Sequence, residues 1–173
     1  MLKNAHQNQI AGLRYFNVFG PNEYHKGAMA SVIFRTLPQA LSDGRVRLFE
    51  SHRSDCAHGE QARDFIYIDE IIDITCFVLQ NRQANGIFNA GTGRAHTFNE
   101  LAHGIFEGLG KKPVIEYFPM PEELRGRYQY FTRADMSRLQ QAGYTPKPDR
   151  FREFVARYVR DYLVPGCRYY AQV

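Results

Sequence analysis

The sequence feature that most constrains the fold is the apolar run at residues 10–19, which Gly20-Pro21 ends. The run is too short for a helix of ordinary length, and Gly-Pro stops regular structure, so it predicts one buried strand. A strand this apolar is typical of parallel sheets covered on both faces. If its sheet neighbours belonged to another part of a longer protein, we would expect its edge to favour self-association.

The rest of the chain alternates between strand-like and helix-like segments, which favours an α/β fold in a single domain of 173 residues. Pro38 inside the first helical pattern predicts a kink or an early end. Thr97 and Glu100 form a capping box. The expected strands are residues 46–49, 65–68, 87–89 and 114–118, and the expected helices are residues 29–41, 69–80, 97–110, 135–143 and 151–163.

Several helices carry a predicted buried face. The first should bury Met29, Val32, Ile33, Leu37 and Leu41, which recur at helical spacing. The second should be capped by Asp69. Its apolar residues Ile72, Cys76 and Leu79 should face the core, and the third helix should bury Leu101, Ile105 and Leu109. The polar segment at residues 52–61 is expected to be an exposed loop.

Composition excludes several classes of protein. The net charge of +4 is spread among acids instead of forming a basic stripe, which argues against nucleic-acid binding. Three widely spaced cysteines predict reduced thiols and not a disulfide framework. No apolar run is long enough to span a membrane, and the polar start has no signal-peptide pattern, so we expect a cytoplasmic protein.

Four segments together resemble one family. Residues 13–21, which read Leu-Arg-Tyr-Phe-Asn-Val-Phe-Gly-Pro, are similar to the strand-to-loop signature of extended short-chain dehydrogenases that act on nucleotide sugars. Three further segments narrow the resemblance to the ADP-L-glycero-D-manno-heptose 6-epimerases of lipopolysaccharide biosynthesis. They are residues 25–31, residues 48–50 with 63–65, and residues 126–129. The resemblance extends over nearly the whole chain.

The resemblance implies the C-terminal part of a Rossmann-type fold, mainly its substrate-binding lobe. We expect residues 1–173 to form one such portion, in which residues 1–20 and about 63–95 complete the cofactor domain. The family's Tyr-x-x-x-Lys motif and its Gly-rich phosphate-binding turn do not occur in the sequence. We therefore expect the NADP-binding half to be absent and this chain alone to be inactive.

In the full-length form, the resemblance implies transient oxidation of an ADP-sugar by NADP and a homo-oligomeric assembly. Lys26 resembles the family's second acid/base and would also contact cofactor, as Val18 would through its backbone. A desolvated amine suits proton transfer to a sugar hydroxyl, although most loop lysines are simply solvated. The positions that resemble substrate-binding residues are Asn17, Ala28, Arg35, Phe49, Glu50, Ser51, His52, Arg63 and Tyr128.

The chemistry of these side chains suits an ADP-sugar. Arg63 is the best diphosphate ligand, because a guanidinium binds two oxygens at once; otherwise it would pair with Asp64 or Glu60. The chain departs from its relatives at three positions, since Ser51 replaces glycine, Ala28 replaces serine and Arg35 replaces histidine.

Two patterns imitate other sites. Gly91-Thr92-Gly93 follows a strand and precedes a helix, like a dinucleotide fingerprint, but a lone Gly-x-Gly more often forms a tight turn before a helix cap. His52, Cys56 and His58 match no zinc spacing, and we expect no metal.

Three alternatives remain open from sequence. The chain could belong to another nucleotide-sugar epimerase or dehydratase of the same superfamily. It could be a non-catalytic binding or assembly module. A nucleic-acid binder is the third, and it lacks both a motif and a charge stripe.

Overall fold

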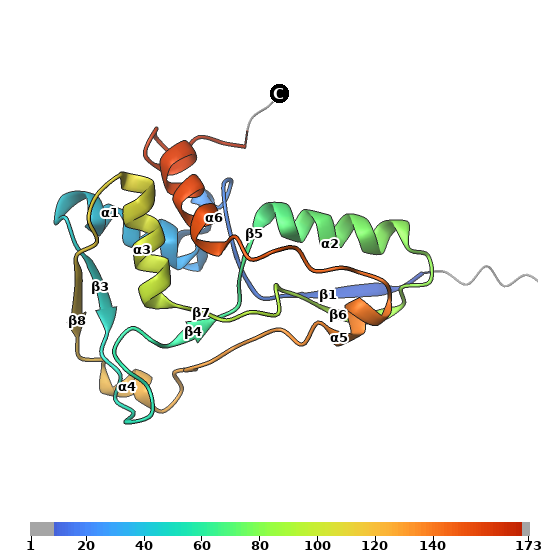
Figure 1. Cartoon of the computed structure of the whole chain (residues 1–173), viewed down its shortest axis with the longest axis horizontal. Helices are drawn as coiled ribbons and strands as arrows, with labels where there is room; N and C mark the ends of the chain where they lie inside the picture. Colours follow the sequence, from blue (N-terminus) through green and yellow to red (C-terminus); the bar gives the residue numbers. More distant parts are fainter. Residues whose placement is uncertain (1–8, 171–173) are drawn as a thin grey trace, which may run out of the picture.

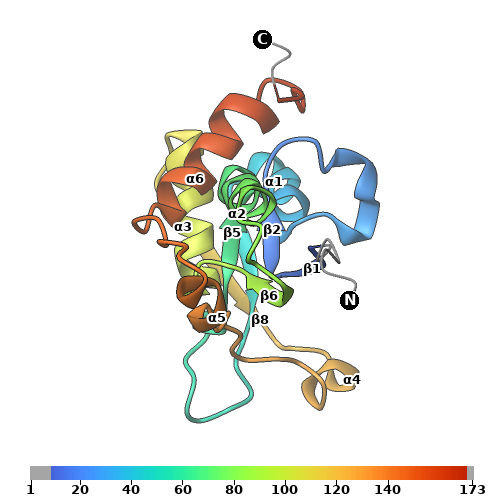
Figure 2. The same cartoon turned by 90° about the vertical axis from the view of Figure 1, so that its right-hand side faces the viewer.

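The structure is a computed structural model that describes residues 9–170, and its shape is elongated (Figure 1). One end holds α1, α3 and α6 above a pair of strands, and the other holds α2 above β1 and β6 (Figures 1 and 2). The strands are β1 (Ala11–Tyr15), β2 (Asn17–Phe19), β3 (Val46–Phe49), β4 (Ala62–Arg63), β5 (Phe65–Tyr67), β6 (Gly86–Ala90), β7 (His96–Thr97) and β8 (Ile115–Phe118). The helices are η1 (Tyr24–Met29), α1 (Val32–Ser42), α2 (Ile68–Gln80), α3 (Phe98–Leu109), α4 (Glu122–Arg125), α5 (Ser137–Gln141), α6 (Phe151–Arg157) and η2 (Tyr158–Leu163).

The strands pair two by two. β1 lies parallel to β6, β2 to β5 and β3 to β8, whereas β4 and β7 form a short antiparallel ladder. Parallel pairs joined through helices confirm the expected α/β class. Residues 1–8 of the expected cofactor-completing segment lie outside the described residues, and the expected division of the chain stays a prediction.

The prediction of one strand over residues 10–19 is wrong, because the segment changes neighbours at Phe16. The Phe16 N–H donates to the Ala90 carbonyl, and the next N–H, of Asn17, donates to the Asp64 carbonyl. The strand therefore follows β6 first and β5 afterwards. Full cover on both faces is also absent within residues 9–170, since Tyr15 is 53% exposed and Ile87 on β6 is 63% exposed.

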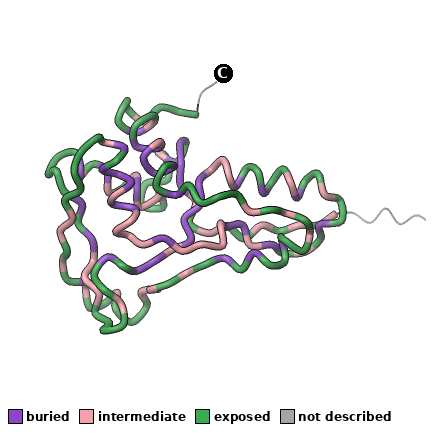
Figure 3. The backbone as a smooth tube through the Cα atoms, viewed as in Figure 1, coloured by how far each residue is buried: buried purple, intermediate pink, exposed green. Residues whose placement is uncertain are grey.

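The predicted core face of α2 is wrong. Ile72 and Leu79 are 51% and 67% exposed, and Cys76 is exposed too. The helix has apolar residues on two sides. The side that is buried carries Ile71, Ile74 and Val78, which pack into the same apolar cluster as residues of β6. The opposite side is the exposed upper edge of the helix in Figure 3. The predicted Asp69 cap is wrong as well, because the N-cap residue is Tyr67 and Asp69 lies inside the first turn.

The other helices follow their patterns more closely. α1 continues through Pro38 to Ser42, so it has no early end there. It buries Ile33, Leu37 and Ala40, whereas Met29 lies outside the helix at 85% exposure and Leu41 is 49% exposed. The capping box before α3 is confirmed, and the last expected helix is confirmed as α6 followed by the π-helical turns of η2. The expected exposed loop at residues 52–61 holds two buried residues, Gly59 and Gln61.

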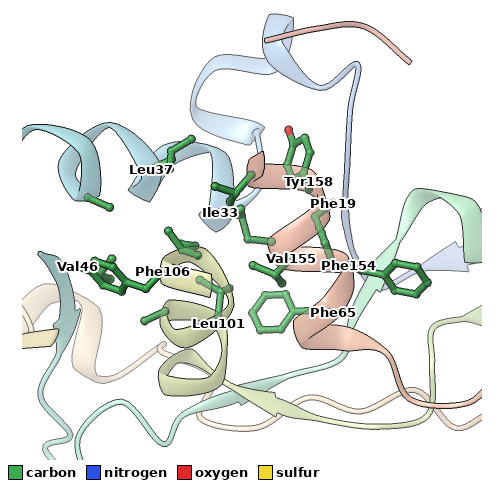
Figure 4. Close-up of a cluster of buried hydrophobic side chains, with 14 of the residues drawn as sticks. Phe19, Ile33, Leu37, Val46, Phe65, Leu101, Phe106, Phe154, Val155 and Tyr158 are labelled. Carbon is green, nitrogen blue, oxygen red and sulfur yellow. The ribbon is translucent and has the colours of Figure 1, made fainter. Parts of the chain in front are cut away.

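Two apolar clusters hold the molecule together. The larger lies between α1, α3 and α6, where Phe19, Phe65 and Phe154 meet the aliphatic side chains of the helices (Figure 4). The smaller lies between α2, β6 and α5. Within residues 9–170, no helix combines the length and the apolar character that crossing a bilayer requires.

The larger cluster depends on close contact between α3 and α6. Gly104 and Gly108 lie one turn apart on α3 and face Val155 and Val159. A Cβ added to Gly108 would lie 2.7 Å from the Ala156 carbonyl oxygen and 2.7 Å from the Cβ of Val159. The absence of a side chain at this position therefore sets how closely the helices approach.

We predict that Gly108→Ala lowers the free energy of unfolding by about 1–3 kcal/mol, because backbone atoms cannot move aside to admit the methyl group. Urea denaturation followed by circular dichroism measures this. Gly126→Ala is the matched control, since no atom lies within 4 Å of its added Cβ. The control should stay within about 0.5 kcal/mol of the parent. Equal stability of both variants would contradict this account of the contact.

Candidate functional site

A cavity of about 400 Å³ opens where β2, α1, β3, β5 and β8 meet. It brings together side chains that are far apart in the sequence, including five of the residues expected to bind substrate. The lining residues are Asn17, Val32, Arg35, Thr36, Arg47, Leu48, Phe49, Gln61, Arg63, Phe65, Phe98, Phe118 and Tyr128.

One wall of the cavity is aromatic. The parallel ladder of β3 and β8 sets Phe49 opposite Phe118, with ring centroids 4.9 Å apart. Tyr128 packs edge-on against Phe49 at 5.9 Å. Together the three rings form a surface suited to a flat ring system.

Three arginines surround this wall. The guanidinium carbon of Arg63 lies 5.4 Å from the centre of the Tyr128 ring, and that of Arg47 lies 4.8 Å from the Phe118 ring. Arg47 also approaches Glu116 at 3.5 Å. Among the described residues, no carboxylate lies within ion-pair distance of Arg63 or Arg35, so the expected alternative pairing of Arg63 with Asp64 or Glu60 is not formed.

Burial shifts the pKa values of the two central polar side chains of the cavity, Arg63 and Tyr128, in opposite directions. It lowers the pKa of Arg63 below its ordinary value and raises the pKa of Tyr128. An arginine remains protonated in any protein environment, so Arg63 presents a partly desolvated positive charge. Such a charge attracts an anion more strongly than a fully solvated one does.

Asp64 explains why Arg63 has no acidic neighbour in contact. Its carboxylate is fully buried and points toward the opposite side of the strand, where it accepts hydrogen bonds from the N–H groups of Thr92, Gly93 and Ala134 at 2.8–3.0 Å and from the Thr92 hydroxyl at 2.8 Å. The Gly-x-Gly turn therefore binds an internal carboxylate. Its expected role as a tight turn before the α3 cap is confirmed.

Lys26 and Val18 lie at a separate cavity of about 180 Å³, lined also by Phe19 to Glu23 and by Ile68. One side chain connects the larger cavity to the loop beside the smaller one, because Nη1 of Arg35 donates to the Ala28 carbonyl at 2.9 Å. The Arg35 side chain thus joins the edge of the larger cavity to the loop that carries Lys26.

Four residues expected to bind substrate line neither cavity: Ala28, Glu50, Ser51 and His52. Ala28 is exposed in η1. The Ser51 N–H donates to Nδ1 of His58 at 2.9 Å, and the His52 ring bonds to the Tyr130 hydroxyl at 2.8 Å. The local contacts of Ser51 and His52 therefore hold the loop after β3.

That loop also contains the residues that imitated a zinc site. His52 and His58 each use a ring nitrogen for the contacts just described. Across residues 9–170, no group of three or more His, Cys, Asp or Glu side chains could hold a metal ion.

Sequence reasoning missed Arg47 and Phe118 among the lining residues. A usable signal existed, because side chains two apart on a strand share a face. Arg47 precedes Phe49 by two residues, and Glu116 precedes Phe118 by two, so the β3–β8 ladder brings all four to one surface. No pattern in the sequence indicated that Gln61 and Phe98 line the cavity, since their positions depend on the β4–β7 pairing, which was not predicted.

The geometry supports binding of a flexible anion with a flat end. Guanidinium groups and a half-buried tyrosine suit phosphate oxygens, and the aromatic wall suits a base or a sugar face. Lys26 at the neighbouring cavity adds a group that can exchange a proton.

Two curated relatives are similar in sequence to most of this chain. It is 48% identical over 154 residues to the ADP-L-glycero-D-manno-heptose-6-epimerase of Nitratidesulfovibrio vulgaris strain DP4, covering 89% of this chain and 48% of the relative. It is 44% identical over 161 residues to the protein of that name from Fusobacterium nucleatum, covering 90% and 48%. The chain thus spans about half the length of the curated relatives it matches.

Solved structures share the fold over the same extent. The ADP-L-glycero-D-manno-heptose-6-epimerase of Helicobacter pylori superposes with a TM-score of 0.66 at 30% identity, over 91% of this chain and 44% of that one. A UDP-N-acetylglucosamine 4-epimerase from Methanobrevibacter ruminantium, in complex with UDP-N-acetylmuramic acid, superposes with a TM-score of 0.71 at 27% identity. The superposition covers 93% of this chain and 48% of that one.

The sequence model of the NAD dependent epimerase/dehydratase family matches residues 1–91, more than half of the chain. With the agreement of the curated relatives and of the solved folds, this chain belongs to the NAD-dependent epimerase/dehydratase family.

Proposed function

We propose that the chain forms the substrate-binding part of an epimerase that interconverts ADP-D-glycero- and ADP-L-glycero-D-manno-heptose at C6 by transient oxidation. The observation that carries the proposal is the single cavity that gathers Asn17, Arg35, Phe49, Arg63 and Tyr128. The 48% identity to a heptose epimerase supports the choice of sugar nucleotide.

In this proposal the cavity binds the ADP moiety. Arg63 takes the diphosphate, because its guanidinium is partly desolvated and has no competing carboxylate in contact. The rings of Phe49 and Tyr128 contact a flat face of the ligand. The sugar end then extends toward Asn17, whose amide both donates and accepts hydrogen bonds.

Lys26 acts as one of two acid/base groups. Its side chain forms no hydrogen bond or ion pair within the described part of the chain, which leaves the amine available to a sugar hydroxyl. A second group, on the opposite face of the sugar, would come from the Tyr-x-x-x-Lys motif of the relatives' other half.

The cofactor is proposed to be NADP, held mostly by residues outside this chain. The cavity at Val18 and Lys26 has about 180 Å³, which fits one end of a dinucleotide but not the whole. The Gly91–Gly93 turn cannot cradle phosphate while Asp64 occupies its N–H groups. When bound, the nicotinamide supplies the acceptor and donor of hydride.

A UDP-sugar epimerase is the second candidate, favoured by the superposition on the Methanobrevibacter enzyme at a TM-score of 0.71. A non-catalytic binding or assembly module is the third. A homo-oligomer of the full-length form is proposed from the family resemblance, whereas the exposed apolar side chains on β1 and α2 fit a surface that the relatives' other half would cover.

We predict that the purified 173-residue chain does not epimerise ADP-heptose, because most of the proposed cofactor site lies outside it. The measurement is the ratio of the two heptose epimers after incubation with NADP. Addition of the relatives' cofactor half serves as the positive arm. Turnover by the chain alone would contradict the proposal that the reaction needs that half.

We predict that the chain binds ADP-glucose more tightly than UDP-N-acetylglucosamine in isothermal titration calorimetry. Arg63→Ala should weaken ADP-glucose binding by about 10- to 100-fold, the usual range for losing a charge-assisted contact. Arg82→Ala, on an exposed turn remote from the cavity, is the control and should bind normally. Tighter binding of the UDP-sugar would favour the second candidate, and no binding of either would refute the proposed site.

We predict that Lys26→Met lowers kcat by about 10²–10⁴-fold when the chain is joined to the cofactor half of its heptose-epimerase relative. The substitution keeps about the volume of the side chain's stem and removes the amine that exchanges a proton. Thermal unfolding should hardly change, because Lys26 is exposed. Near-normal turnover with normal folding would show that Lys26 is an ordinary loop lysine.

A further inference from the structure

The loop between β2 and α1 carries Lys26, and a single buried carboxylate joins its two ends. Glu23 is 4% exposed. One of its oxygens accepts the Ser31 N–H at 2.6 Å, and the other accepts the Ser31 hydroxyl at 2.6 Å and the Tyr158 hydroxyl at 2.9 Å. The carboxylate thus closes the segment from Glu23 to Ser31 and ties it to the C-terminal helix.

Apolar contact holds this loop at only one residue of η1, because Tyr24 packs against the larger cluster with its ring 5.6 Å from the Phe34 ring. None of the residues of η1 is buried, and Gly27 at φ 53° interrupts the helix. The loop's regular backbone contacts are few, chiefly the Lys26 N–H donating to the Glu23 carbonyl at 2.9 Å and the Ala30 N–H donating to Gly27 at 3.1 Å. Its conformation therefore depends on the polar contacts at its ends.

The donors are well suited to a permanent contact. No Lys, Arg or His lies within ion-pair distance of Glu23 among residues 9–170, so the three donors alone compensate for its burial. Burial, with the neighbouring Glu23 charge, raises the pKa of Tyr158, which keeps the phenol protonated as a donor.

The C-terminal segment covers the outer side of the same loop. The Tyr24 hydroxyl donates to the Arg168 carbonyl at 2.5 Å, and the Tyr170 N–H donates to the side chain of Asn22 at 2.9 Å. The Tyr24 and Tyr169 rings lie 5.5 Å apart. These contacts fix the outer side while Glu23 fixes the inner one.

We propose that Glu23 is a positioning residue that holds Lys26 beside Val18 by clamping the loop to Ser31 and Tyr158. The inference rests on the proposed function, in which Lys26 meets the sugar. It is supported by Glu23, Lys26 and Val18 lining the same cavity. A neutral amide replaces the carboxylate only in part, since Gln has one accepting oxygen where Glu23 uses both, and the negative charge that strengthens these hydrogen bonds is lost.

Hydrogen exchange of the 173-residue chain, resolved by segment, tests the clamp. Glu23→Gln should speed amide exchange across residues 24–30 by about tenfold, as expected when a charge-assisted anchor is lost. Exchange in α3 should not change. Glu23→Asp keeps both oxygens and should recover part of the protection, whereas Glu122→Gln, on exposed α4, should match the parent.

The same experiment with added ligand distinguishes a role of Glu23 in positioning the loop from a role in the stability of the whole fold. ADP-glucose should slow exchange across residues 24–30 in the parent. In Glu23→Gln its affinity should stay within about threefold, because Arg63 and Tyr128 are untouched, yet the protection of residues 24–30 should disappear. If Glu23→Gln does not fold, Tyr158→Phe removes one donor from the same carboxylate and should give a smaller form of the same effect.

Each result has a distinct meaning. Unchanged exchange at residues 24–30 in Glu23→Gln, or faster exchange spread equally over α3, overturns the clamp. So does ligand protection that survives the substitution. Absence of ADP-glucose binding by the parent instead refutes the proposed function, and the exchange of the free chain still decides whether Glu23 holds the loop.

Discussion

The buried carboxylate of Asp64 is the contact on which the arrangement of the candidate site depends. It joins the turn after β6, through Thr92 and Gly93, to the segment at Ala134. Four short hydrogen bonds offset the cost of burying a charge without a cation. Because Asp64 lies between Arg63 and Phe65, the same contact directs both neighbouring side chains to the other face of the chain, where they line the cavity.

A second buried carboxylate repeats this solution at the other cavity. Glu23, like Asp64, is satisfied by backbone and hydroxyl donors, and among the described residues neither has a basic partner. Neutral donors leave the positive side chains Arg63 and Lys26 uncompensated. The lack of an ion-pair partner strengthens the attraction of Arg63 for an anionic ligand, whereas Lys26 shares its cavity with the Glu23 carboxylate.

Sequence periodicity predicted which segments are regular better than it predicted their faces or neighbours. The α6 pattern is unambiguous, since its apolar residues form one stripe. α2 has apolar residues on two sides, so only packing into the smaller cluster decides that Ile74 is buried and Ile72 is exposed. The division of residues 10–19 likewise depends on Asp64, whose carbonyl accepts from Asn17. Such tertiary contacts leave no periodic signal in the sequence.

The candidate site was predictable only as separate residues, because the resemblance supplied positions and no geometry. It gave no reason to expect that Arg35 and Lys26 are mechanically connected. The structure links them through the Ala28 carbonyl, which accepts from Arg35. A ligand that draws Arg35 into the larger cavity would therefore act on the loop that Glu23 clamps. The proposed ligand binding at one cavity and the proposed proton exchange at Lys26 thus both involve the stretch of backbone between Glu23 and Ser31.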